Sequence, residues 1–317
     1  MNLRPIKMRV ACLAVLALLP APGAAQGAGQ PYLLVETGQR FAALDLAVRA
    51  IGDGKGTISV AQGTYRDCAV QLGADVSVVA EVPGTVVFDG GICEGKATYV
   101  SRGRSTSFSG LIFQNQRVAD GNGAGIRLER GNLFVTQSWF RDAEQGILTA
   151  PDLAGNVTIE KSTFSRLGRC DRGLSCAHSI YVGDYGSLTV RRSRFEEGRG
   201  GHYIKTRSTR VEITDNSFDD SKGKATNYMI DLSIGGTGLI ARNWMVQGED
   251  KENWSAFIAI GAEGPWKPAD GLQIRENDAR LAPGVDRTTA FVADWTGHRI
   301  VIGENRLGRG LIRFEKR

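Results

Sequence analysis

Short segments with the same alternation of apolar and polar positions recur along the chain. Each has two aliphatic or β-branched residues separated by one residue, a polar pair, a Ser or Asn, and then an aromatic or large apolar residue. The clearest copies are residues 157–164, 188–195 and 211–218, with related segments at 133–140, 239–245, 272–277 and 300–307. Phe140 and Phe164 lie 24 residues apart, Phe195 and Phe218 lie 23 apart, and Phe218 and Met245 lie 27 apart. A period of this size, together with such alternation, predicts short strands in a solenoid. One repeat cannot bury its apolar face alone, so successive coils must stack.

Ahead of these repeats, residues 41–51 carry apolar side chains at helical spacing and end at Gly52. An amphipathic helix in this place would cover the open strand edges of the first coil. We therefore expect an N-terminal capping helix.

The first 25 residues have the features of an export signal. Arg4, Lys7 and Arg9 precede an apolar run at 10–19, and small residues follow at 23–25. The run is too short to span a bilayer as a helix. We expect a signal peptide at 1–25, one domain at 26–317, no membrane span, and a periplasmic or secreted product.

Charge and cysteine content indicate the kind of partner and the compartment of the protein. The chain has 39 basic and 34 acidic residues, and three of the basic residues lie in the leader. This balance excludes a typical nucleic-acid partner. Beyond the leader, the even number of cysteines suits an oxidising compartment. Four cysteines can form disulfides in three ways, and proximity in the sequence favours Cys68 with Cys93 and Cys170 with Cys176. A zinc site is the weaker alternative, because it needs closely spaced cysteine pairs.

Several segments carry a resemblance to a known family. The N-terminal part of the chain resembles the opening of right-handed parallel β-helix proteins of the pectate-lyase-like superfamily. The resemblance is carried by the expected helix, by Gly52-Asp53-Gly54, and by residues 57–60 and 63–65. Residues 118–127, 146–150, 178–183, 201–207 and 228–232 are similar to secreted bacterial β-helix repeat proteins. The resemblance implies an all-β fold: a single-stranded right-handed parallel β-helix, or solenoid, with an N-terminal capping helix. It does not decide activity, because the superfamily includes lyases, hydrolases, epimerases and non-enzymes.

A second column of strands can be aligned on one isoleucine per coil. The aligned residues are Ile126, Ile147, Ile180, Ile204, Ile230 and Ile258. If each isoleucine points inward, the next residue points outward. The outward column then reads Arg127, Leu148, Tyr181, Lys205, Asp231 and Ala259.

This register predicts that Tyr181, Lys205 and Asp231 touch in succession, with Arg207 on the same face. His178, His202 and Tyr228 stand two residues before their isoleucines, so strict alternation turns them inward unless the pleat breaks at a corner. Both functional and packed structural histidines fit this position. An ordinary cross-strand salt-bridge ladder would also explain the cluster.

The chemistry of the cluster suits β-elimination of a uronate-containing glycan, with Lys205 as base, Arg207 on the substrate carboxylate and Tyr181 as proton donor. Asp231 would orient Lys205 or help to bind calcium, but acidic ligands are too few for a convincing metal site. The candidate catalytic residues are Lys205, Arg207, Tyr181, His202 and His178, and the candidate substrate-binding residues are Asp231, Tyr228 and Arg127.

The leading function is therefore a secreted polysaccharide lyase, expected to be a monomer that needs no cofactor. One alternative is a glycoside hydrolase, which needs two carboxylates where only Asp231 is well placed. The other is a non-catalytic solenoid that binds polysaccharide or the cell envelope. Asn216, Asn243, Asn277 and Asn305 are expected to form a structural ladder, and exposed tryptophans among 244, 254, 266 and 295 could stack on sugar rings.

Overall fold

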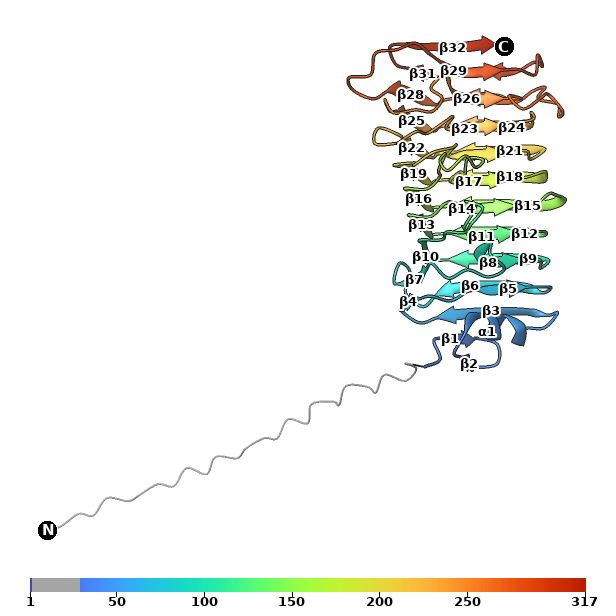
Figure 1. The fold of residues 1–317 in the computed structure, drawn as a ribbon, viewed down its shortest axis with the longest axis vertical. Coiled ribbons are helices and arrows are strands. Elements are labelled where there is room, and N and C mark those ends of the chain that lie inside the picture. Colours follow the sequence, from blue (N-terminus) through green and yellow to red (C-terminus); the bar gives the residue numbers. More distant parts are fainter. Residues whose placement is uncertain (2–28) are drawn as a thin grey trace.

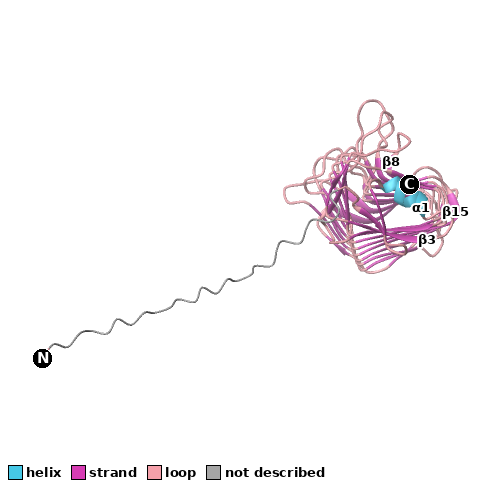
Figure 2. Cartoon of the chain, turned by 90° about the horizontal axis from the view of Figure 1, so that it is seen from below, coloured by secondary structure: helices cyan, strands magenta, loops and turns pink. Residues whose placement is uncertain are grey.

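The computed structural model describes Met1 and residues 29–317, so the expected signal peptide lies outside the described residues except for its first residue. From residue 29 onward the chain winds into stacked coils (Figure 1), and each complete coil contributes one strand to each of three parallel sheets. Seen along the stack, the strands enclose the interior and loops project at the corners (Figure 2). The predicted all-β parallel β-helix is confirmed.

Sheet A has 12 strands and begins with the antiparallel β1 (Tyr32–Leu34) and β2 (Gln39–Phe41). Its parallel strands are β3 (Lys55–Val60), β6 (Asp75–Ala80), β9 (Ser105–Ser109), β12 (Asn132–Thr136), β15 (Asp152–Glu160), β18 (Tyr185–Arg191), β21 (Arg210–Thr214), β24 (Thr237–Ala241), β27 (Gln273–Arg275) and β30 (Val301–Ile302). Sheet B consists of β4 (Gly63–Tyr65), β7 (Val86–Asp89), β10 (Leu111–Gln114), β13 (Trp139–Arg141), β16 (Thr163–Ser165), β19 (Arg194–Glu196), β22 (Ser217–Asp219), β25 (Trp244–Gln247), β28 (Asp278–Leu281) and β31 (Arg306–Leu307).

Sheet C carries the candidate site. It consists of β5 (Ala69–Gln71), β8 (Ala97–Ser101), β11 (Ala124–Leu128), β14 (Gln145–Thr149), β17 (Ile180–Val182), β20 (Ile204–Thr206), β23 (Ile230–Leu232), β26 (Ala256–Ile260), β29 (Thr289–Asp294) and β32 (Leu311–Lys316). Every third strand of the chain enters this sheet, so residues one coil apart become neighbours.

The N-terminal end is covered by α1 (Leu44–Ala50), as predicted. Leu44, Ala47 and Val48 are buried, and the helix packs against β5, β1 and β2. It begins later than the periodicity suggests because Phe41 ends β2. Among the described residues, no helix has the length and apolar character needed to cross a membrane.

The repeated aromatic positions form a stack inside sheet B. From Phe113 to Phe218, successive rings lie 4.8 to 5.0 Å apart and within 5° to 9° of parallel. This spacing matches the distance between hydrogen-bonded strands, so each ring contacts the rings of the coils before and after it. The repeated aromatic positions of the sequence are therefore positions that pack in the core.

A ladder of asparagines runs along one corner of the coils. The Oδ1 of Asn243 accepts from the backbone N–H of Asn216 and from its Nδ2, both at 3.0 Å. In the same way, the Oδ1 of Asn277 accepts from the backbone N–H and the Nδ2 of Asn243, and the Oδ1 of Asn305 accepts from those of Asn277. The expected structural role is confirmed, because these amides satisfy buried corner groups.

Two disulfides join the expected pairs, Cys68 with Cys93 and Cys170 with Cys176. Each closes a loop beside a strand of sheet C. Their presence is compatible with an oxidising, extracellular compartment.

Candidate functional site

The predicted register of sheet C is confirmed. Tyr181 pairs with Lys205, Lys205 with Asp231, and Asp231 with Ala259 on successive strands. The isoleucines that precede them are fully buried in the core. The backbone ladder therefore fixes the order of three polar side chains along the outer face of β17, β20 and β23.

The pleat breaks just before these residues. Tyr203 and Ile204 are consecutive, yet both belong to the hydrophobic core. Two inward residues in succession place His202 and Lys205 together on the outer side of the sheet. The ring of His202 accordingly stacks on His178 at 4.9 Å and on Tyr228 at 5.5 Å. The sequence left this point open, and the structure resolves it in favour of a broken pleat.

Asp231 lies at the base of the cluster. It is only 2% exposed, and its Oδ2 accepts a hydrogen bond from the Ser233 hydroxyl at 2.7 Å. The Lys205 Nζ is 3.7 Å from the same oxygen. Burial raises the pKa of Asp231 to about 6, although the charge of Lys205 opposes the rise. The carboxyl is thus poised to exchange a proton in mildly acidic solution.

A carboxylate that the sequence reasoning missed completes the site. Glu263 lies in the loop of residues 261–272, which connects β26 to β27 and is called the Glu263 loop below. Its two oxygens accept from the Lys205 Nζ and from an Arg207 Nη at 2.6 Å. Burial opposes ionisation, but the hydrogen bonds from Lys205 and Arg207 lower the pKa of Glu263 overall. The site therefore contains one ionised carboxylate held by two cations.

Tyr181 lies beside the two cations. The Lys205 Nζ is 5.5 Å from the centre of the tyrosine ring, and the Arg207 guanidinium carbon is 5.8 Å from it. Burial raises the pKa of Tyr181, although the charge of Arg207 opposes the rise. The phenol keeps its proton at neutral pH and can donate it.

The two histidines are packed groups. His178 is 5% exposed and His202 is 8% exposed, and burial lowers the pKa of His178 to about 3 and that of His202 well below its usual value. The 3.5 Å approach of the His202 Nε2 to Asp231 is thus a contact of a neutral ring. The backbone N–H of His202 donates to the His178 Nδ1 at 3.0 Å. These rings form the side of the site next to Tyr181 and Asp231.

The remaining candidates lie further from the cluster. Tyr228 is 7% exposed, stacks on His202, and its hydroxyl accepts from Asn253. Arg127 pairs in register with Leu148, which pairs with Tyr181, so it lies two strands away. Its Nε is 3.7 Å from Glu129, within a separate ion-pair network that includes Arg102.

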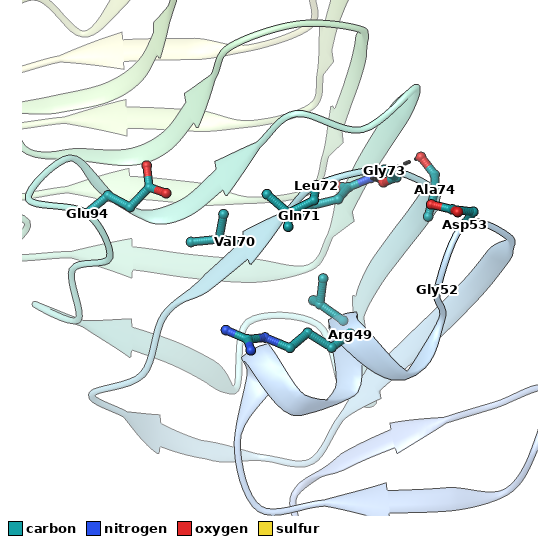
Figure 3. Close-up of a pocket in the computed structure, with 10 residues that line it drawn as sticks. Arg49, Gly52, Asp53, Val70, Gln71, Leu72, Gly73, Ala74 and Glu94 are labelled. Carbon is teal, nitrogen blue, oxygen red and sulfur yellow. Dashed lines mark hydrogen bonds between the residues drawn. The ribbon is translucent and has the colours of Figure 1, made fainter.

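A pocket of about 460 Å³ lies elsewhere, between α1 and β5 (Figure 3). It is lined mainly by apolar groups, together with Arg49, Asp53 and Glu94. In sheet C, β8, β11, β14 and β17 separate β5 from the strand of Lys205. Within residues 29–317, no group of three or more His, Cys, Asp or Glu side chains is placed to hold a metal ion.

One protein family has a sequence pattern that agrees with this architecture. A family model described as "Right handed beta helix region" matches residues 89–244. The solved structure of the surface protein and adhesin PfbA of Streptococcus pneumoniae aligns over 86% of this chain and 94% of its own, at 11% identity and a TM-score of 0.46. No curated protein matches the chain. The chain is a right-handed parallel β-helix protein.

Proposed function

We propose that the protein is an exported polysaccharide lyase that cleaves a uronate-containing glycan by β-elimination. The observation that carries this proposal is the bridging of Lys205 and Arg207 by one carboxylate, that of Glu263. Two cations at this spacing suit the planar carboxylate of a uronic acid equally well. The substrate carboxylate takes the place of Glu263 when the glycan binds.

Elimination needs three groups, and the cluster offers one for each task. Arg207 neutralises the carboxylate at C6 of the sugar, which makes the C5 proton easier to remove. Lys205, released from Glu263, gives its own proton to solvent and, as the neutral amine, takes the C5 proton. The electron pair of the C5–H bond forms the C4=C5 double bond, the C4–O bond breaks, and Tyr181 protonates the leaving oxygen. Asp231 orients Lys205 from below.

The first test is the product formed from polygalacturonate, alginate and hyaluronate. A lyase produces an unsaturated uronate that absorbs ultraviolet light, and we expect this signal with at least one of the three polymers. Lys205→Ala and Tyr181→Phe should each abolish it. Since Lys205→Ala removes a partner of buried Asp231, its thermal unfolding is measured alongside, and Tyr181→Phe serves as the variant least disturbing to packing. New reducing ends without ultraviolet absorbance would refute the lyase.

A glycoside hydrolase is the second candidate, and Glu263 favours it. The sequence offered only Asp231, whereas the structure brings Glu263 to the same lysine. Burial raises the pKa of Asp231, while Lys205 and Arg207 lower that of Glu263 against the effect of burial. Two carboxyls with separated pKa values are the pattern of a general acid and its ionised partner. Glu263→Gln separates the two functions: a hydrolase loses activity, and a lyase keeps it with a lower KM.

Export, and a periplasmic or secreted location, belong to the same proposal. They are supported by the basic and apolar composition of residues 1–25 and by the two disulfides. A protein that binds one of the glycans but cleaves none would be the non-catalytic solenoid. Mass measurement in solution tests the expected monomer.

A further inference from the structure

We propose that Trp266 forms a sugar-binding subsite beside the Lys205–Arg207 pair, with a pyranose ring of the acidic glycan stacked on its indole. The identity of the glycan rests on the proposed function. The subsite itself is a binding site, so it can be tested whether or not the glycan is cleaved.

Trp266 is the most exposed tryptophan among those of the described residues that lie on the surface. The residue is 72% exposed, compared with 46% for Trp254 and 38% for Trp244. Single exposed apolar residues are common on protein surfaces and carry no argument alone. Trp266 differs from such residues in how its side chain is held and in what lies beside its loop.

The indole is held against the main chain of its own loop. Gly264 has a φ of +121°, and a Cβ at this position would lie 2.8 Å from the Trp266 Nε1. Only glycine permits both this backbone conformation and this approach. One part of the ring thus rests on Gly264, while most of the side chain remains in solvent.

Contacts on both sides of Trp266 attach the loop to the candidate site. Glu263 is bound by Lys205 and Arg207. On the other side, the Lys267 Nζ donates to the Arg207 carbonyl at 2.7 Å and pairs with Asp184, and the Lys267 N–H donates to the Ile234 carbonyl at 2.8 Å. Trp266 therefore belongs to a loop that is attached to Arg207 on both sides of it.

This placement gives two-point recognition of an acidic glycan. The carboxylate of one sugar binds Lys205 and Arg207, and the apolar face of a sugar ring covers the exposed indole. Tryptophan suits this role because its large rigid surface loses little conformational freedom on binding. When Glu263 yields to the substrate carboxylate, the contacts of Lys267 keep the loop attached.

The experiment measures binding by calorimetry to size-defined oligosaccharides of galacturonate, alginate and hyaluronate. For an oligosaccharide that the wild type binds, Trp266→Ala should raise the Kd about tenfold, the amount expected for loss of one aromatic stack. The matched control is Trp244→Ala, which removes the same side chain from β25 of sheet B and should leave the Kd unchanged.

The outcomes separate the subsite from the cleavage reaction. If Trp266→Ala binds more weakly and the wild type forms no unsaturated product, the subsite is supported and the lyase is refuted. An unchanged Kd and KM in a variant that still produces unsaturated uronate refutes the subsite and leaves the lyase standing. Equal loss of affinity in Trp244→Ala and Trp266→Ala, or no binding of any of these oligosaccharides by the wild type, also overturns the subsite.

Discussion

Replacing Asp231 with Asn should stabilise the protein at neutral and alkaline pH. The carboxyl is buried next to Lys205, Ser233 and the neutral ring of His202, with Glu263 and Arg207 also acting on its charge. Burial raises its pKa from 3.8 to about 6 despite the attraction of Lys205. The folded protein therefore holds this proton more tightly than the unfolded chain does. Ionising the group works against folding.

The size of the effect follows from linkage. Each pKa unit corresponds to about 1.4 kcal/mol, so a rise of about two units amounts to about 3 kcal/mol. Because the folded pKa is raised, the stability contributed by the bound proton is complete below pH 4 and is lost as the pH rises through about 6. Asn cannot ionise and should keep that stability at every pH.

The assay compares thermal and urea unfolding of wild type and Asp231→Asn at pH 4.5 and pH 8. We expect an advantage for Asp231→Asn of about 1 kcal/mol at pH 4.5, where the unfolded carboxyl is already largely ionised, and of about 3 kcal/mol at pH 8, or about 5 °C in Tm for a chain of this size. The matched control is Asp220→Asn. Asp220 is equally buried, but it pairs with the buried Lys251 and accepts from Tyr203, so this variant should lose stability at both pH values.

Lower stability of Asp231→Asn than of wild type at pH 8 would refute the reasoning. It would mean that the attraction between Asp231 and Lys205 outweighs the cost of burial. Asp231 would then be an ordinary structural ion-pair partner.

Three further substitutions test the frame around the site. Lys251→Met leaves the carboxylate of Asp220 buried without its cation and should lower the free energy of unfolding by about 3–5 kcal/mol in urea titrations. Asn243→Ala removes the acceptor of two buried donors of Asn216 and should cost about 3 kcal/mol, and a cost below about 1 kcal/mol would contradict the ladder. Phe195→Ala opens a cavity in the middle of the ring stack and should lower the free energy of unfolding by about 3–5 kcal/mol, measured by differential scanning calorimetry. A variant as stable as the wild type would contradict this role of the stack.

The repeats predicted the fold because they report a period that strands and core share. The register of Tyr181, Lys205 and Asp231 followed from the same period. The alternation of side chains alone did not predict where the pleat breaks, yet the sequence carries a signal for it: Tyr203–Ile204 is an apolar pair where strict alternation predicts one apolar residue.

Glu263 was beyond the reach of this reasoning. It lies in an irregular loop, and its contacts with Lys205 and Arg207 span 58 and 56 residues. Loops have no periodicity that would predict their path. The burial of Asp231 was missed as well, because the register placed it on the outer face and said nothing of what covers that face.

The corners of the coils differ greatly in length while the strands keep their register. Residues 207–209 suffice to connect β20 to β21, whereas 261–272 connect β26 to β27 and carry both Glu263 and Trp266. Since the ladders between coils involve the strands, a corner can be exchanged without disturbing the coils above and below. Specificity can therefore diverge by insertion and deletion at single turns, and grafted corners offer a route to β-helices with new ligands.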